Sequence, residues 1–235
     1  MATKKVVQGL IVTAALCLCT TSVHAQGYRL YIMGADSSVT DARTFTEGHI
    51  NYNSFYAGGA KAIAGLEVPF YKIFGIEVSY GIGSNNLEVN QLGYPYTLIK
   101  AYSVRNSRFS GDIVLHVPGS WKGLHAYGLA GVEYDRFAPT SHAQTLALSE
   151  GFAYSPSAKL ASQGQTGYNI GGGLDHKVIS KVDLRLEARY HSFGSPTYGL
   201  PQGATTASAA YFPIGGSAHD IEYSIGLVYR FGKSQ

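Results

Sequence analysis

The chain has few cysteines, no long hydrophobic run beyond its N-terminus and little imbalance of charge. Both of its cysteines, Cys17 and Cys19, lie within the first 25 residues. A mature chain without them has no disulfide, although small exported domains often depend on disulfides for stability. No later stretch is long and apolar enough for a membrane-spanning helix, which needs about 20 such residues.

The N-terminus has the features of a secretory signal peptide. Lys4 and Lys5 precede a largely apolar run, after which Val23-His24-Ala25 supplies small residues at the two positions that signal peptidase recognises. We expect cleavage after Ala25, so that residues 1–25 are the signal and residues 26–235 form one domain. Without the two signal lysines, 16 basic residues stand against 15 acidic ones, which gives no support to nucleic-acid binding.

After the signal, apolar and polar residues alternate in eight segments. A period of two is typical of β-strands, whose side chains point to opposite faces in turn. In the segment from Val182 to His191 the even positions are apolar, and the odd positions carry Asp, Arg, Glu, Arg and His. The predicted strands cover residues 28–36, 55–68, 74–85, 105–117, 124–137, 164–178, 182–193 and 219–231.

The connections between these segments are alternately long and short. The short turns are residues 69–73, 119–122 and 179–181, and the long connections are residues 37–54, 86–104, 138–163 and 194–218. Outer-membrane barrels have short periplasmic turns and long extracellular loops. Because hydrocarbon offers no partner to an unpaired backbone group, the strands must close into a ring. The sequence therefore predicts an all-β fold, an eight-stranded antiparallel up-and-down transmembrane barrel.

Tyrosine is the commonest aromatic residue, with 18 copies, and several copies lie near the ends of predicted strands. Aromatic residues are enriched at the two membrane interfaces. We expect an interfacial belt that includes Tyr28, Tyr56, Tyr80, Tyr134, Tyr168, Tyr190 and Tyr229.

The charged residues share the parity that faces the interior of such a barrel. Eight strands leave room inside for side chains and little else, so we expect inward charges to pair across strands. The predicted lumen charge network contains Arg108, Asp112, Glu133, Asp183, Arg185, Glu187, Arg189, Glu222 and Arg230. Four more charged residues have this inward-facing parity: Arg29, Lys61, Glu67 and Glu77.

The last predicted strand ends with a spaced motif. Ser224 is polar, Gly226 follows two residues later, and Tyr229 and Phe231 are aromatic. The whole mature chain resembles the OmpA/OmpX-type eight-stranded outer-membrane barrels, also described as outer-membrane β-barrel domain or porin-family proteins, whose C-terminal assembly signal has this spacing. The resemblance implies insertion by the barrel-assembly machinery into the outer membrane of a diderm, Gram-negative bacterium. A monomer in contact with outer-membrane lipid and lipopolysaccharide is the expected state.

The sequence gives little support to a cofactor or metal site. Seven histidines remain after cleavage, but no two of them are spaced like ligands on one strand or helix face. Gly171-Gly172-Gly173 is followed by neither a helix pattern nor the Lys-Ser of a phosphate loop, and close strand packing explains it better. We predict no catalytic residue, no cofactor and no metal.

The strongest enzymatic alternative rests on His191 and Ser192. Outer-membrane lipid A deacylases are also eight-stranded barrels, with a histidine and a serine near a strand end. Those enzymes separate the two residues by one position, whereas adjacent residues of a strand point to opposite faces. We therefore predict a non-enzymatic barrel with a structural or surface-interaction role carried by extracellular loops. A narrow porin for ions or small solutes and a lipid A deacylase-like acyl hydrolase are the alternatives.

Overall fold

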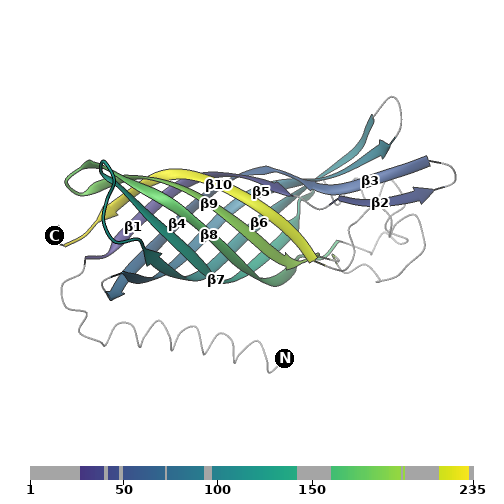
Figure 1. The fold of residues 1–235 in the computed structure, drawn as a ribbon. Helices are drawn as coiled ribbons and strands as arrows, with labels where there is room; N and C mark the ends of the chain where they lie inside the picture. The colour runs from purple at the N-terminus through teal and green to yellow at the C-terminus, as the bar shows by residue number, and fades with distance from the viewer. Residues whose placement is uncertain are drawn as a thin grey trace, which may run out of the picture.

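The computed structural model is a closed antiparallel β-barrel with a sheet that projects from one end (Figure 1). The structure describes residues 27–39, 42–47, 50–71, 73–92, 97–141, 160–196, 198 and 217–232. The predicted signal peptide lies outside these residues. No helix in the described ranges combines the length and the apolar character that crossing a bilayer would need.

Ten strands form one continuous sheet. They are β1 (Arg29–Val39), β2 (Ala42–Glu47), β3 (Ile50–Ala57), β4 (Gly59–Tyr71), β5 (Phe74–Leu92), β6 (Thr97–His116), β7 (Leu124–Pro139), β8 (Gln163–Ile179), β9 (Val182–Gly194) and β10 (Ser217–Arg230). All pairings are antiparallel, and the ring closes because β5 pairs with both β4 and β6 while β1 pairs with both β4 and β10. Eight strands, all except β2 and β3, make up the ring, which confirms the predicted fold class.

The second predicted strand, residues 55–68, starts in the wrong place. Residues 55–57 belong to β3, and β4 begins only at Gly59. The chain passes very close to its neighbours here, because a Cβ atom on Gly58 would lie 2.0 Å from the carbonyl oxygen of Ser37. A Cβ atom on Gly59 would lie 1.8 Å from the carbonyl oxygen of Ser84. Glycine is therefore required at both positions, and the break between the two strands falls at the first of them, Gly58.

Two of the predicted long loops contain strands, so the loop prediction is wrong for both. Residues 37–54 include β2 and part of β3, and residues 86–104 include the outer part of β5 and the first part of β6. Strands β2 and β3 and these parts of β5 and β6 form the projecting sheet at the right of Figure 1. A sheet outside the membrane need not alternate apolar and polar residues, which removes the period-two signal. The other two long connections lie largely outside the described residues.

The outer face of the ring is apolar. Side chains of Leu, Ile and Val that would be costly to leave in water are exposed all around it, among them Leu30, Ile32, Val78, Ile113, Leu115, Val132, Ile170, Leu186, Ile225 and Leu227. The side chains at the alternate positions of the same strands point inward and are mostly buried. A barrel whose outer wall meets hydrocarbon requires this arrangement.

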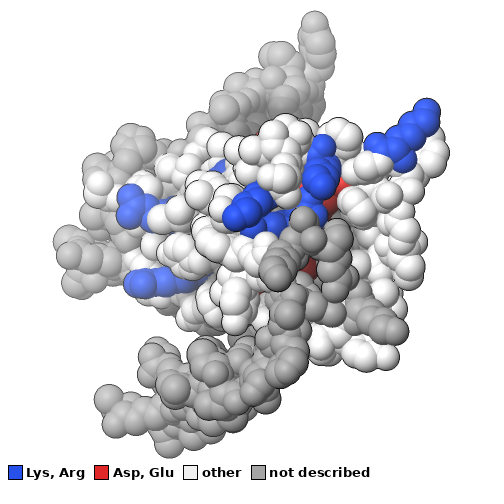
Figure 2. Space-filling model, turned by 90° about the vertical axis from the view of Figure 1, so that its left-hand side faces the viewer, with Lys and Arg blue, Asp and Glu red and all other residues white. Residues whose placement is uncertain are grey.

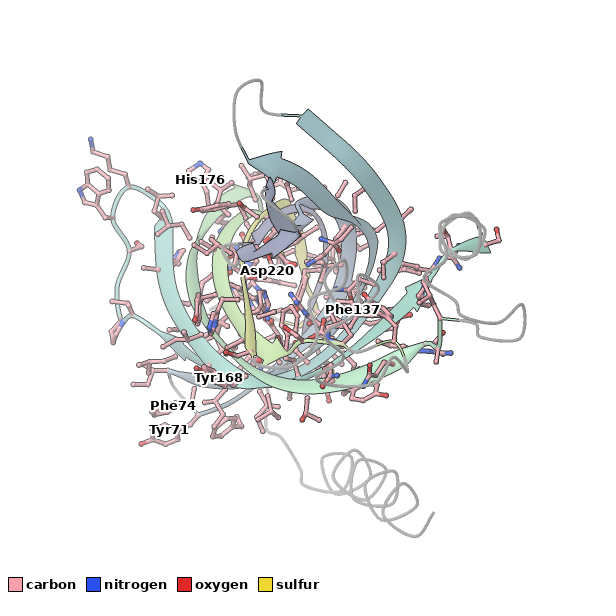
Figure 3. The ribbon with its side chains drawn as sticks, turned by 90° about the vertical axis from the view of Figure 1, so that its right-hand side faces the viewer. Tyr71, Phe74, Phe137, Tyr168, His176 and Asp220 are labelled. Carbon is pink, nitrogen blue, oxygen red and sulfur yellow. The ribbon has the colours of Figure 1, made fainter. Side chains whose placement is uncertain are left out.

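Exposed aromatic side chains form a belt at each end of this apolar band. At the end with the short turns they are Tyr28, Phe70, Tyr71, Trp121, Tyr229 and Phe231. Towards the projecting sheet they are Tyr80, Phe109, Tyr134, Tyr168 and Tyr223. Figure 3, which looks along the barrel from the projecting end, shows Tyr71 and Tyr168 outside the ring. Of the tyrosines predicted for the belt, Tyr190 is only half-exposed, and the side chain of Tyr56 lies outside the description.

Candidate functional site

The interior of the barrel holds an unusual density of charge. Ten carboxylates point inward and are buried: Glu67, Glu77, Asp112, Glu133, Asp135, Asp175, Asp183, Glu187, Asp220 and Glu222. Six basic side chains lie among them: Arg29, Lys61, Arg108, Arg185, Arg189 and Arg230. The structure buries eight of the nine residues of the predicted lumen charge network in this interior, and the ninth, Arg230, is half-exposed at the end with the short turns. Figure 3 shows Asp220 inside the ring.

Arg185 is the centre of the network. Its side chain on β9 is completely buried, and its guanidinium group bonds to both oxygens of Asp175 on the adjacent strand β8, at 2.8 and 3.1 Å. The same group reaches across the lumen to Glu67 on β4 and Glu77 on β5, at 3.1 Å each. In the ring, β5 lies opposite β9. One side chain therefore joins both walls of the barrel.

Aromatic rings enclose the same guanidinium group. Its carbon atom lies 4.5 Å from the ring centre of Tyr127 and 5.1 Å from that of Tyr31. Such cation–π contacts are strongest where the cation is removed from water. The Tyr127 hydroxyl also donates a hydrogen bond to Glu187, at 2.6 Å.

Arg189, four residues further along β9 on the same face, makes a second connection across the lumen. It bonds to Asp112 on β6 at 2.8 Å, to Glu77 on β5, and to Glu187 on its own strand. The Asn169 side-chain amide donates a further hydrogen bond to Asp112, at 2.8 Å. These groups, together with those around Arg185, form a continuous layer of hydrogen-bonded charge.

A second group of charges lies nearer the projecting sheet. Lys61 bonds to Asp220 and Glu222, at 3.1 and 2.9 Å. Arg108, across the ring from β10, bonds to Asp135 at 2.8 Å and to Glu222 at 3.3 Å. We call Lys61, Arg108, Glu133, Asp135, His191, Asp220 and Glu222 the upper cluster.

The upper cluster has more carboxylates than cations. Its four carboxylates face only one lysine and one arginine, Lys61 and Arg108, and the remaining member, His191, bonds through Nδ1 to Glu133 at 2.6 Å. One oxygen each of Glu133, Asp135 and Asp220 is buried without a hydrogen-bond partner among the described residues. Buried polar atoms of this kind normally hold a water molecule or an ion.

At the end with the short turns, the network reaches the surface. Arg29 bonds to Asp175 at 2.9 Å and to Glu67 at 3.2 Å, and His116 lies 2.6 Å from Glu67. Arg230 pairs with Asp183.

Hydrophobic side chains fill the interior space between the charged groups. They form two clusters: Tyr31, Met33, Ala35, Ile63 and Val228, and Val114, Tyr127 and Leu129.

The inward charges predicted from the sequence omitted three of these carboxylates, Asp135, Asp175 and Asp220. All three lie on the inward parity of their strands: Asp135 is two residues from Glu133, Asp175 is six from Asn169, and Asp220 is two from Glu222. The signal was therefore present, and extending the parity along β7, β8 and β10 would have found them.

His191 and Ser192 do not come together as a nucleophile and base. His191 is buried inside and bonded to Glu133, whereas Ser192 has the opposite parity and lies opposite His219 and Tyr168 in the sheet.

The three glycines from Gly171 to Gly173 lie within β8, where a Cβ atom on Gly171 would come 2.5 Å from the carbonyl oxygen of Ala188. Close strand packing thus explains these glycines. Within the described ranges, no three His, Cys, Asp or Glu side chains are grouped as metal ligands.

The predicted assembly signal lies on β10 and directly after it. Ser224 and Gly226 point inward, and a Cβ atom on Gly226 would lie 2.1 Å from the carbonyl oxygen of Ile32. Tyr229 and Phe231 point outward and pack edge to face, with ring centres 4.7 Å apart. The backbone N–H of Phe231 donates to the carbonyl oxygen of Tyr28, at 2.7 Å. The aromatic end of the motif therefore closes the seam between the two chain ends.

A closed eight-stranded barrel with an apolar outer wall, two aromatic belts and a charged interior defines a bacterial outer-membrane β-barrel. The family model described as outer membrane protein beta-barrel domain matches residues 11–231, and the chain belongs to this family. Its location is accordingly the outer membrane of a Gram-negative bacterium. A search of curated proteins found no match.

Solved structures of small outer-membrane barrels share the fold. OprG from Pseudomonas aeruginosa is 13% identical, with a TM-score of 0.55 over 89% of this chain and 97% of that chain. Neisserial surface protein A (NspA) is 12% identical, with a TM-score of 0.54 over 87% and 97%. The outer membrane protein AlkL, solved in lipid bilayers, is 11% identical, with a TM-score of 0.51 over 92% and 95%. These similarities concern the fold alone.

Replacing Arg185 with alanine leaves three carboxylates in the interior without their shared cation. We expect Arg185→Ala to lower the free energy of unfolding by about 3–5 kcal/mol, measured by urea titration of the folded protein in lipid vesicles. Lys181→Ala, in an exposed turn, is the control and should change it by less than about 0.5 kcal/mol. Adding Glu77→Gln to Arg185→Ala should recover part of the loss, because the two groups are coupled. Equal midpoints for Arg185→Ala and the wild type would contradict the central role of Arg185.

The assembly motif predicts a sharp difference between Phe231 and the residues that follow it. Phe231→Ala removes the last aromatic side chain of the motif and its contact with Tyr229, so we expect much less folded protein in the outer membrane. Deleting residues 232–235 should have a smaller effect. The measurement is the fraction of heat-modifiable, folded protein on unheated gels. A larger loss from the deletion would mean that the signal includes the tail.

Proposed function

We propose that this protein is a non-enzymatic outer-membrane barrel with a closed lumen, and that it serves a structural or surface-interaction role through its extracellular part. The observation that carries the proposal is the position of Arg185. This side chain is fully buried in the middle of the lumen and bonded to carboxylates of three other strands. A path for solutes along the axis would have to displace it.

Further contacts across the lumen support closure. Arg189 joins β9 to β5 and β6, and Arg108 joins β6 to β10. Removing one partner from a buried pair of this kind typically costs about 3–5 kcal/mol. Opening the lumen would require several such pairs to separate together. We call the ion pairs of Arg108, Arg185 and Arg189 the plug of the lumen.

The projecting sheet is the part of the described structure best placed for contact with other molecules. It continues past the ring on the side opposite to the short turns, which face the periplasm in this class of barrel (Figure 1). Among the described residues, strand β2 pairs only with β3, and residues 97–102 of β6 pair only with β5. Such strand edges can accept an extended segment of a partner by backbone hydrogen bonding. This supports a surface-interaction role.

The same proposal covers export, assembly and oligomeric state. Cleavage after Ala25 would release the mature chain, and the motif from Ser224 to Phe231 would direct it to the barrel-assembly machinery. Since one chain closes the ring by itself, a second copy is not needed to satisfy the strands. We therefore propose a monomer surrounded by outer-membrane lipid and lipopolysaccharide.

A narrow porin is the second candidate, and the upper cluster favours it. The upper cluster has four carboxylates but only one lysine and one arginine, and three of its buried oxygens have no hydrogen-bond partner among the described residues. It could attract cations and water at the extracellular entrance. This cluster lies above the layer around Arg185, so a pore would still need a way past that layer.

Conductance in planar bilayers tests closure directly. We expect the folded wild type to show no steady single-channel steps, because Arg185 and Arg189 block the axis. A steady current whose cation selectivity changes with Glu133→Gln or Asp220→Asn, while the stability of the barrel does not, would replace the closed barrel with a narrow porin.

Removing the projecting sheet tests whether the barrel can fold without it, as a sheet with a role only at the surface would allow. Short turns from Ser37 to Gly59 and from Asn86 to Ser103 would join residues that are already paired or nearly paired in register. We expect this variant to keep its heat-modifiable mobility and a denaturation midpoint close to the wild type, because the plug lies entirely within the ring. A variant that no longer folds would show that the sheet serves the barrel itself.

A further inference from the structure

Charge is segregated between the inside and the outside of this protein. Of the eleven carboxylates whose side chains the structure describes, ten are buried in the interior and only Asp36 is exposed. The exposed basic side chains are Arg105, Arg136, Lys122, Lys177 and Lys181. Figure 2, which faces the end with the short turns, shows basic side chains around that rim and little acidic surface. The described outer surface is therefore positive.

Two of these residues, Arg105 and Arg136, are neighbours on the outer wall. Arg136 on β7 lies opposite Ser107 of β6, and Arg105 is two residues further along β6 on the same face. Diagonal neighbours of this kind lie about 7–8 Å apart, so a single anion can contact both guanidinium groups. The one exposed carboxylate that is described, Asp36, belongs to β1 on the opposite side of the ring.

The arginine pair lies just beyond an aromatic belt. Phe109 and Tyr134 are directly opposite one another, and both are exposed. Towards the projecting sheet, Arg136 is two residues beyond Tyr134 and Arg105 is four residues beyond Phe109, about 7 and 13 Å along the strands. Long arginine side chains at this depth keep their stems against the apolar wall and their charged groups among lipid headgroups.

Tyr134 adds a polar group at the same height. A Cβ atom on Gly164 would lie only 1.9 Å from the Tyr134 hydroxyl oxygen, so the tyrosine side chain lies over this glycine. Gly164 is the register partner of Arg136. The Tyr134 ring therefore belongs to the apolar belt while its hydroxyl group reaches the level of Arg136. Ser107 and Gly164, on either side of Arg136, are too small to cover it.

We propose that Arg105, Arg136 and the Tyr134 hydroxyl bind a phosphate group of lipopolysaccharide in the outer leaflet, with Phe109 against its acyl chains. Guanidinium groups match phosphate oxygens by paired, charge-assisted hydrogen bonds. The leaflet identifies the ligand, because this end of the barrel lies away from the short periplasmic turns. The proposal depends on the location in the outer membrane and not on whether the lumen conducts.

Native mass spectrometry of the folded protein in neutral detergent, titrated with bis-phosphorylated lipid A, tests the site. We expect the double variant Arg105→Gln/Arg136→Gln to bind at least tenfold more weakly than the wild type. Lys122→Gln/Lys181→Gln removes the same charge from the opposite rim and should bind as the wild type does. Heat-modifiable mobility shows that each variant is folded, and the conductance measurement tests the plug separately.

Two further probes separate the possible ligands. Lipid A without its phosphate groups should bind equally weakly to the wild type and to the arginine variant. Equal affinity of these two proteins for phosphorylated lipid A, or an equal loss in the lysine variant, would overturn the site. Phosphatidylglycerol binding as tightly as lipid A would overturn the assignment to lipopolysaccharide.

Discussion

Closure of the strand ring is the constraint on which the rest of this structure depends. In hydrocarbon, every backbone N–H and C=O group must find a partner within the protein, so the first and last strands of the barrel must meet. They meet along the whole length of β1, from Arg29 opposite Arg230 to Val39 opposite Asp220 of β10. Closure with eight strands fixes a narrow interior, and the two-residue period then sends half of all side chains into it. Inward residues must therefore fill the space and satisfy one another.

This narrow interior explains why arginine carries the network. Arg185 bonds to three carboxylates on different strands while two aromatic rings cover its faces. A lysine has the charge but not the planar set of five donors that such an arrangement uses. Carboxylates still outnumber arginine and lysine side chains inside, and nearly all described acidic side chains are there. The outer wall is left with the basic residues, which suits a surface that meets anionic headgroups on both sides of the membrane.

The sequence predicts the strands whose outer face lies in lipid. The same pattern does not identify the strands that lie outside the membrane in water. The inward charges from Arg29 to Arg230 are recoverable because one misplaced charge on the lipid face costs about 2–4 kcal/mol at mid-bilayer, which keeps the alternation regular. Strands β2 and β3 lie beyond the membrane, so nothing imposes that alternation and residues 37–54 look like a loop. The contacts of Arg185 with Glu67 and Glu77 were also beyond reach, because parity tells which face a residue takes and not which residue stands across the lumen.

The projecting sheet is a continuation of barrel strands β5 and β6. Strands β5 and β6 have 19 and 20 residues, whereas a strand tilted across the bilayer needs about 9–11. Roughly half of each strand therefore extends beyond the membrane, and the two strands remain paired there, with one shift of register between Val89 and Asn90. The β2–β3 hairpin pairs with the same extension through residues 51–57. The interaction surface proposed for this sheet consists of paired strands, so association with a partner would cost less conformational entropy than it would for flexible loops.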